Sequence, residues 1–98
     1  MFEKIESIIA DSFGISRERL IGKELLREVT DAKHFLYYIL YFIYGYKAIS
    51  IAERYGVTKV NVYSSIRQIH NGIRTQKYYA NIHARILKDI LEKGGDLS

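Results

Sequence analysis

Residues 51–66 constrain the fold most, because two amphipathic stretches flank a single glycine there. Gly56 permits the positive φ that a tight corner needs, and Thr58 can cap a following helix with its hydroxyl. Beyond this cap, apolar residues recur at spacings of four, three and four, as one face of a helix requires; they are Val62, Ile66, Ile69 and Ile73. The pattern predicts a helix-turn-helix whose second helix ends near residues 71–72.

Helical periodicity also fills the rest of the chain, which contains no proline and no strand-like alternation. We expect five to six helices: one over residues 2–12, a short one capped by Ser16 and stopped by Gly22, a third starting at Thr30 or Asp31, a fourth over residues 48–55, the second helix of the motif, and a last one from a Thr75 cap through about Lys93. The sequence therefore predicts a small all-α domain over residues 1–93, followed by a flexible tail over residues 94–98.

The third expected helix carries an unbroken apolar and aromatic run over residues 35–44. A membrane span needs about twenty apolar residues, so the run is too short and we expect no membrane partner. One helix cannot be surrounded completely in so small a domain, and tyrosines tolerate the surface well. The sequence leaves two possibilities for what packs against this aromatic surface. One is the last helix of the same chain, and the other is a second copy in a homodimer through this helix or the C-terminal helix.

Positive charge is concentrated in the second half of the chain. Residues 1–31 hold seven acids and five bases, whereas residues 57–88 hold six Lys or Arg and no Asp or Glu. Duplex DNA carries about one phosphate charge per 1.7 Å, and a basic surface gains affinity for it by releasing counterions. The distribution favours double-stranded DNA as the partner, with a solvated basic face that binds nothing as the alternative.

Residue types that support catalysis or metal binding are scarce. The chain has no Cys, and His34, His70 and His83 lie on three different expected helices without paired carboxylates at ligand spacing. A glycine-rich phosphate loop and a nucleophile motif are also missing. We therefore expect no enzymatic activity, no metal and no cofactor. The lack of cysteine and of a signal peptide favours a cytoplasmic setting.

Side chains opposite the apolar stripe of the second motif helix are the candidates for DNA contacts. Lys59 can donate to guanine, Val60 offers methyl groups to thymine, and Asn61 can bond an adenine edge. The predicted base-reading set is Thr58, Lys59, Val60, Asn61 and Tyr63. Phosphates are expected along the groove walls and near the start of the preceding helix, at Lys47, Ser64 and Arg67.

Residues 51–66 are similar to the general bacterial helix-turn-helix pattern, and a longer match over residues 5–73 resembles the C-terminal DNA-binding domain of the bacterial chromosomal replication initiator, the DnaA family. The match is carried by Ile9, Phe13-Gly14-Ile15-Ser16, Leu20, Lys33, Ile51, Tyr55-Gly56, Val62, Ser65, Arg67 and Ile69. The resemblance implies duplex DNA binding in replication or transcription regulation. It also implies a DNA-backbone contact at Lys33, whereas the family's nucleotide-hydrolysing module has no counterpart here.

The family's recognition motif, Gly-Arg-Asp-His-Thr-Thr-Val, is not kept. The resemblance places Thr58 at its Asp and residues 59–61 at its His and two Thr positions. The acidic acceptor for a cytosine amino group is therefore gone, so the family's usual binding site would not be read faithfully. A competing hypothesis is a protein-interaction or oligomerisation domain that has kept the shape of the motif without its DNA readout.

The resemblance also implies a minor-groove contact from the segment before the third helix. In the family this segment is a basic loop that lays an arginine into the minor groove. That position is Leu25 here, and Lys23 and Arg27 on either side can substitute for it. The alternative is that these two cations simply pair with their neighbouring acids, Glu24 and Glu28.

Overall fold

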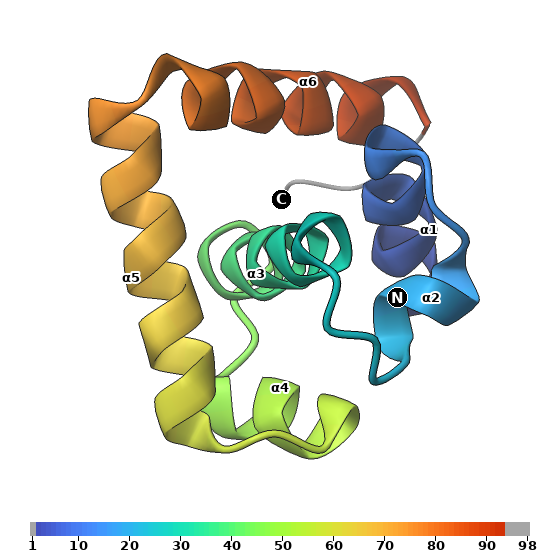
Figure 1. Ribbon diagram of the computed structural model, residues 1–98, viewed down its shortest axis with the longest axis vertical. Helices are drawn as coiled ribbons and strands as arrows, with labels where there is room; N and C mark the ends of the chain where they lie inside the picture. Colours follow the sequence, from blue (N-terminus) through green and yellow to red (C-terminus); the bar gives the residue numbers. More distant parts are fainter. Residues whose placement is uncertain (1, 94–98) are drawn as a thin grey trace.

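The computed structural model describes residues 2–93, and all regular structure in that range is helical. The elements are α1 (Phe2–Phe13), α2 (Arg17–Ile21), α3 (Arg27–Phe42), α4 (Ala48–Tyr55), α5 (Lys59–Thr75) and α6 (Lys77–Glu92). Figure 1 views α3 nearly along its axis, with the other helices arranged around it. The predicted all-α class is confirmed, and the tail predicted for residues 94–98 lies outside the described residues.

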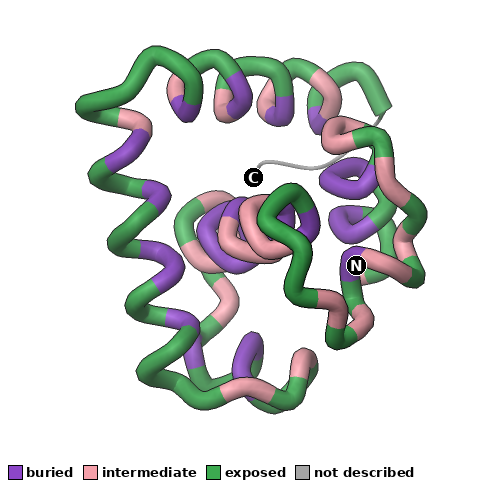
Figure 2. Tube along the Cα trace, in the orientation of Figure 1, coloured by how far each residue is buried: buried purple, intermediate pink, exposed green. Residues whose placement is uncertain are grey.

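The aromatic helix α3 is the one that the others enclose. All of residues 35–40 are buried, and Figure 2 shows the buried positions of α5 and α6 turned toward them. The ring of Phe35 contacts Phe13 of α1 and Tyr79 of α6, with centroid separations of 5.8 and 5.9 Å. The last helix of the same chain therefore covers part of this run. Within residues 2–93, none of the helices has the length and apolar character needed to cross a bilayer.

The start of α3 differs from the prediction by one turn. The helix begins at Arg27 rather than at Thr30 or Asp31, and Leu26 at its N-cap offers no side-chain bond. Instead, the amides of Val29 and Thr30 bond to the carbonyl oxygen of Leu26 at 3.0 and 2.9 Å. Burial of Val29 stabilises this uncapped turn, and such burial is invisible in local sequence.

The junction between α5 and α6 also corrects the prediction. The helix α5 runs past Gly72, which is buried against α6. The two helices are so close here that an added Cβ at Gly72 would lie only 2.8 Å from the Tyr79 ring. Gly72 thus allows two helices to approach closely rather than ending one. Thr75 does not cap α6: its hydroxyl donates to the Asn71 carbonyl oxygen at 2.8 Å, and Gln76 occupies the cap position.

Contacts between α1 and α6 close the arrangement of helices. The hydroxyl of Ser12 donates to the Asp89 carboxylate at 2.6 Å, and Arg85 donates to the Ser12 carbonyl oxygen at 2.9 Å. These bonds hold α6 to the side of the molecule away from α4, as Figure 1 shows. The outward side of α5 is consequently left uncovered by α6.

Candidate nucleic-acid interface

Two helices and a glycine corner form at the positions predicted for the motif. The corner is Gly56, with φ 66° and ψ 33°, and the amide of Val57 bonds to the Ala52 carbonyl oxygen at 3.0 Å. Thr58 caps α5, because its hydroxyl oxygen accepts from the Asn61 amide at 3.1 Å. That hydroxyl still has a proton to donate to a ligand. The local geometry therefore follows from these few residues.

The predicted DNA contacts on α5 all reach the surface. We call them the outer face of α5: Lys59, Val60, Asn61, Tyr63, Ser64 and Arg67. Val60 is 73% exposed and Tyr63 is 43% exposed. On the opposite side of the helix, Val62 and Ile69 are completely buried against the body. One side of α5 anchors the helix and the other is free to meet a partner.

The outer face has a centre and two flanks, because successive residues turn by roughly 100° around a helix. Val60, Ser64 and Arg67 lie opposite the buried stripe and form the centre. Tyr63 lies on the flank nearer the end of α3, where its ring meets Tyr41 edge-on at 6.1 Å. Asn61 lies on the other flank. Of the three, Val60 and Ser64 lie nearest the point directly opposite the stripe.

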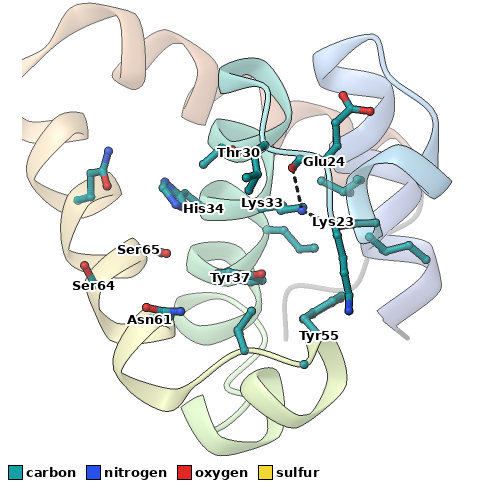
Figure 3. Close-up of a pocket in the computed structure, with 18 residues that line it drawn as sticks. Lys23, Glu24, Thr30, Lys33, His34, Tyr37, Tyr55, Asn61, Ser64 and Ser65 are labelled. Carbon is teal, nitrogen blue, oxygen red and sulfur yellow. Dashed lines mark hydrogen bonds between the residues drawn. The ribbon is translucent and has the colours of Figure 1, made fainter.

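A hollow of about 600 Å³ lies beside the Asn61 flank, between α5, α3 and residues 20–25. Figure 3 shows Asn61 and Ser65 of α5 across from His34 of α3. Burial lowers the pKa of His34, with Asp31 opposing the effect, so its ring is mostly neutral at pH 7. Gln68 also lines the hollow and was missed in the sequence, although its spacing from Asn61 is the seven residues of two helical turns.

Lys33 of α3 lines the hollow and is hydrogen-bonded to the segment on its other side. Its ammonium group donates to the carbonyl oxygens of Gly22 and Glu24, and Figure 3 shows it reaching from α3 to that segment. Burial lowers the pKa of Lys33. These two bonds use two of the three ammonium protons, so one remains for an acceptor outside the protein. The backbone contact that the resemblance implies for Lys33 stays a prediction.

The acids next to the loop cations have another partner. Arg19 donates through Nε to Glu24 at 3.2 Å and lies 3.7 Å from Glu28. The bond from Arg19 holds the pKa of Glu24 below its usual value. The alternative in which Lys23 and Arg27 pair with these two acids is therefore wrong. Lys23 is exposed and has no ion-pair partner among residues 2–93.

The other two loop positions are strongly exposed. Arg27 lies 4.0 Å from Asp31, one turn along α3, and its side chain is 90% exposed, so this pair is weak. Leu25, at the position of the family's arginine, is 89% exposed. Lys23 and Leu25 thus line the hollow on the side across from α5, whereas Arg27, the first residue of α3, lies outside the hollow, in a depression that Tyr78 of α6 also lines.

Several cations have neither an ion pair nor a hydrogen bond within the described part of the chain. They are Lys23, Lys47, Lys59, Arg67, Arg74 and Lys77. Lys47 directly precedes α4, as predicted. Arg74 and Lys77 were missed, although Arg74 follows Arg67 by seven residues and so lies on the same side of α5. Lys59, Arg67 and Arg74 lie on α5, Lys47 directly precedes α4, and Lys77 is the first residue of α6.

Within residues 2–93, no three His, Asp or Glu side chains gather as metal ligands would. No family model matches the chain, and no curated protein sequence matches it.

Proposed function

We propose that this protein binds double-stranded DNA, using α4 and α5 as a helix-turn-helix with α5 in the major groove. The observation that carries the proposal is the outer face of α5, which is uncovered and holds cations without acidic partners. Such a protein would regulate replication or transcription in the cytoplasm, without hydrolysing nucleotides. The resemblance to the replication initiator domain supports the same function.

The dimensions of α5 suit a major groove, which is about 12 Å wide and admits one helix. In this arrangement Val60, at the centre of the outer face, meets a thymine methyl group. Lys59 and Asn61 on the two flanks donate to guanine and adenine edges, respectively. Thr58 and Tyr63 complete the base-reading set. Thr58 is the N-cap of α5 and the others are in its first or second turn, where a docked helix approaches the bases most closely.

Phosphates on both sides of the groove have cations available. Lys47 reaches one strand from the start of α4, and Ser64 and Arg67 reach the other from α5. The hollow beside α5 leaves room for a backbone strand between α5 and the loop. Lys23 and Arg27 then lie near the adjacent minor groove, where their charge matters more than one exact position. These contacts set the register of the protein without reading sequence.

A salt titration of binding to a random duplex tests the proposal directly. About four phosphate contacts give a slope of log K against log salt near −3.6. The expected result is measurable binding at low salt that weakens steeply as salt rises. No detectable binding at low salt would contradict the proposal. Selection from a random duplex pool then identifies any preferred sequence, and its enrichment measures how well the altered motif reads bases.

A second candidate function is assembly with another protein or another copy of the chain. The observation that favours it is Phe42, which is 52% exposed at the end of α3 and stacks on His70 of α5 at 5.9 Å. Exposed aromatic surface of this kind is common at protein interfaces. Sedimentation of the protein at several concentrations separates the two candidates. Assembly predicts a salt-insensitive dimer that Phe42→Ser weakens, whereas DNA binding predicts no effect of this substitution on affinity for duplex.

A further inference from the structure

Glu6 of α1 is a completely buried carboxylate that three helices share. Arg17 of α2 donates to its Oε1 at 2.9 Å. From α4, the Tyr55 hydroxyl donates to Oε2 at 2.6 Å, and Arg54 donates to the same oxygen at 3.3 Å. The carboxylate thereby ties the N-terminal helices to the end of α4.

Tyr55 is the last residue of α4 and stands directly before the glycine corner. Its ring packs against Tyr37 and Phe2, with centroid separations of 5.5 and 6.3 Å. Burial, and then the hydrogen bond to Glu6, raise the pKa of Tyr55 far above its usual value. The phenol therefore remains a donor at any physiological pH. The corner is fixed by a residue 49 positions earlier in the chain.

Apolar packing holds α4 only weakly by comparison. The helix has eight residues, and only Ala48, Ile51 and Ala52 are buried. Two of these three are alanines, which bury little surface and give little resistance to sliding or rotation. The hydrogen bonds to Glu6 are directional, so they define one orientation. In contrast, α5 is fixed on α3 by its own buried stripe.

We propose that Glu6 is a positioning residue for DNA reading. Through Tyr55 and Arg54 it fixes α4, and hence the phosphate contact at Lys47, relative to the base-reading turn of α5. A phosphate contact from α4 and base contacts from α5 must form together, so this relative position sets the register. The inference rests on the proposed function and adds a residue far from the interface that governs its specificity.

The test uses Tyr55→Phe, which removes the hydroxyl bond to Glu6 and keeps the ring. Tyr79→Phe, at a buried tyrosine of α6, is the matched control. Amide hydrogen exchange at Gly56 and Val57, whose amides bond to the Ala52 carbonyl oxygen, reports the corner without DNA. Binding is measured with a selected duplex and with a random one, well below the melting temperature of each variant.

In Tyr55→Phe we expect these two amides to exchange about five- to tenfold faster, the effect of losing one hydrogen bond. The affinity ratio of selected to random duplex should fall by a similar factor, and Tyr79→Phe should change neither. Glu6→Gln should act in the same direction. The double variant should lose less than the sum of the two single losses, because both remove the same contact.

Two results would overturn the inference. Faster exchange spread evenly over α3, α5 and α6 would mean that Glu6 only stabilises the fold. Faster exchange at the corner with an unchanged affinity ratio would mean that the position of α4 does not govern reading. Failure of the proposed function itself is recognised separately, because the unsubstituted protein would then bind neither duplex at low salt; the DNA-reading role of Glu6 would fall with it.

Discussion

Two regions of this protein use arginine and lysine in opposite ways. Near α1 and α2 the cations are neutralised, as Arg17 bonds to Glu6 and Arg19 bonds to Glu24. On α5, Lys59 and Arg67 have no acidic partner within residues 2–93. The first arrangement joins helices to one another, and the second leaves charge available to a ligand.

The absence of acids on α5 has a physical consequence. Glutamates one turn from Lys59 or Arg67 would give the helix a few tenths of a kcal/mol each in surface pairs. Residues 57–88 contain none, so the positive potential of this side is not cancelled locally. Unpaired charge of one sign attracts an oppositely charged polymer over about a Debye length. We propose that the packed helices, here called the body, provide stability and that the outer face of α5 provides contact with a partner. The following substitutions test this division.

The largest effect is expected from Phe35→Ala in the body. Phe35 is completely buried between α1 and α6, so the substitution should lower the free energy of unfolding by about 3 to 5 kcal/mol. Urea unfolding measures the loss, and Phe35→Leu should lose less. Molecules that remain folded should bind duplex with unchanged affinity. A fall in affinity without a fall in stability would contradict the proposal that Phe35 serves stability and that binding depends on the outer face of α5.

Lys59→Ala should weaken DNA binding and leave the stability of the fold nearly unchanged. If Lys59 contacts a base, affinity for the selected duplex falls by about 1 to 3 kcal/mol, while the unfolding free energy changes by less than about 0.5 kcal/mol. Fluorescence anisotropy measures the binding. The control is Lys88→Ala, because Lys88 of α6 lies 3.9 Å from Glu92 and should not contribute. An unchanged affinity would remove Lys59 from the base-reading set.

Gly72→Ala tests the buried side of α5. The added Cβ would meet the Tyr79 ring at 2.8 Å, so overpacking should lower stability by about 1 to 3 kcal/mol despite the better helix propensity of alanine. Asn71→Ala, at the exposed neighbouring position, should change stability by no more than about 0.5 kcal/mol. Thermal melting compares the two. A more stable Gly72→Ala protein would contradict the close packing of α5 on α6.

Arg67→Ala and Arg19→Ala sharpen the comparison of the two kinds of cation. Loss of one phosphate contact at Arg67 should make the slope of log K against log salt shallower by about 0.9, equally for all duplexes. Arg19→Ala should leave that slope unchanged and lower stability only slightly, because its ion pairs are partly exposed. Equal slopes for both variants would contradict the assignment of Arg67 to the interface.

The smallest effect is a dependence of stability on pH. Burial lowers the pKa of both His34 and His83. At His34 the charge of Asp31 opposes this effect without cancelling it. The unfolded chain, with histidine pKa values near 6.5, therefore takes up protons first. The stability that these residues contribute is complete above that pKa and is lost as pH falls through it toward the folded values. Urea midpoints at pH 7.5 and 5.5 measure this, and His34→Gln with His83→Gln should reduce the difference.

Local features of the fold could be predicted from the sequence. Ser16 caps α2, Thr58 caps α5, and Gly56 forms the corner, as expected. Each depends on backbone groups within four residues of the side chain concerned. The outer face of α5 was predicted for the same reason, because helical periodicity separates its exposed positions from the buried stripe at Val62, Ile66 and Ile69.

Features that depend on distant residues were missed. Local sequence gave no sign that Glu24 would pair with Arg19 instead of with a neighbouring lysine, or that Lys33 would hold the loop. The extension of α5 past Gly72 depends on Tyr79, which lies on a different helix. These contacts form only when packing brings the partners together.

The amino-acid sequence by itself determined the helical class, the corner between α4 and α5 and the basic, acid-free character of α5, since periodicity, capping and charge act over a few residues. The tertiary structure alone decided which charges are neutralised and which stay available. It placed the carboxylate of Glu6 beneath Tyr55, 49 residues away. Such a choice needs two side chains to lose water together in one enclosed space, and only the packed helices create that space.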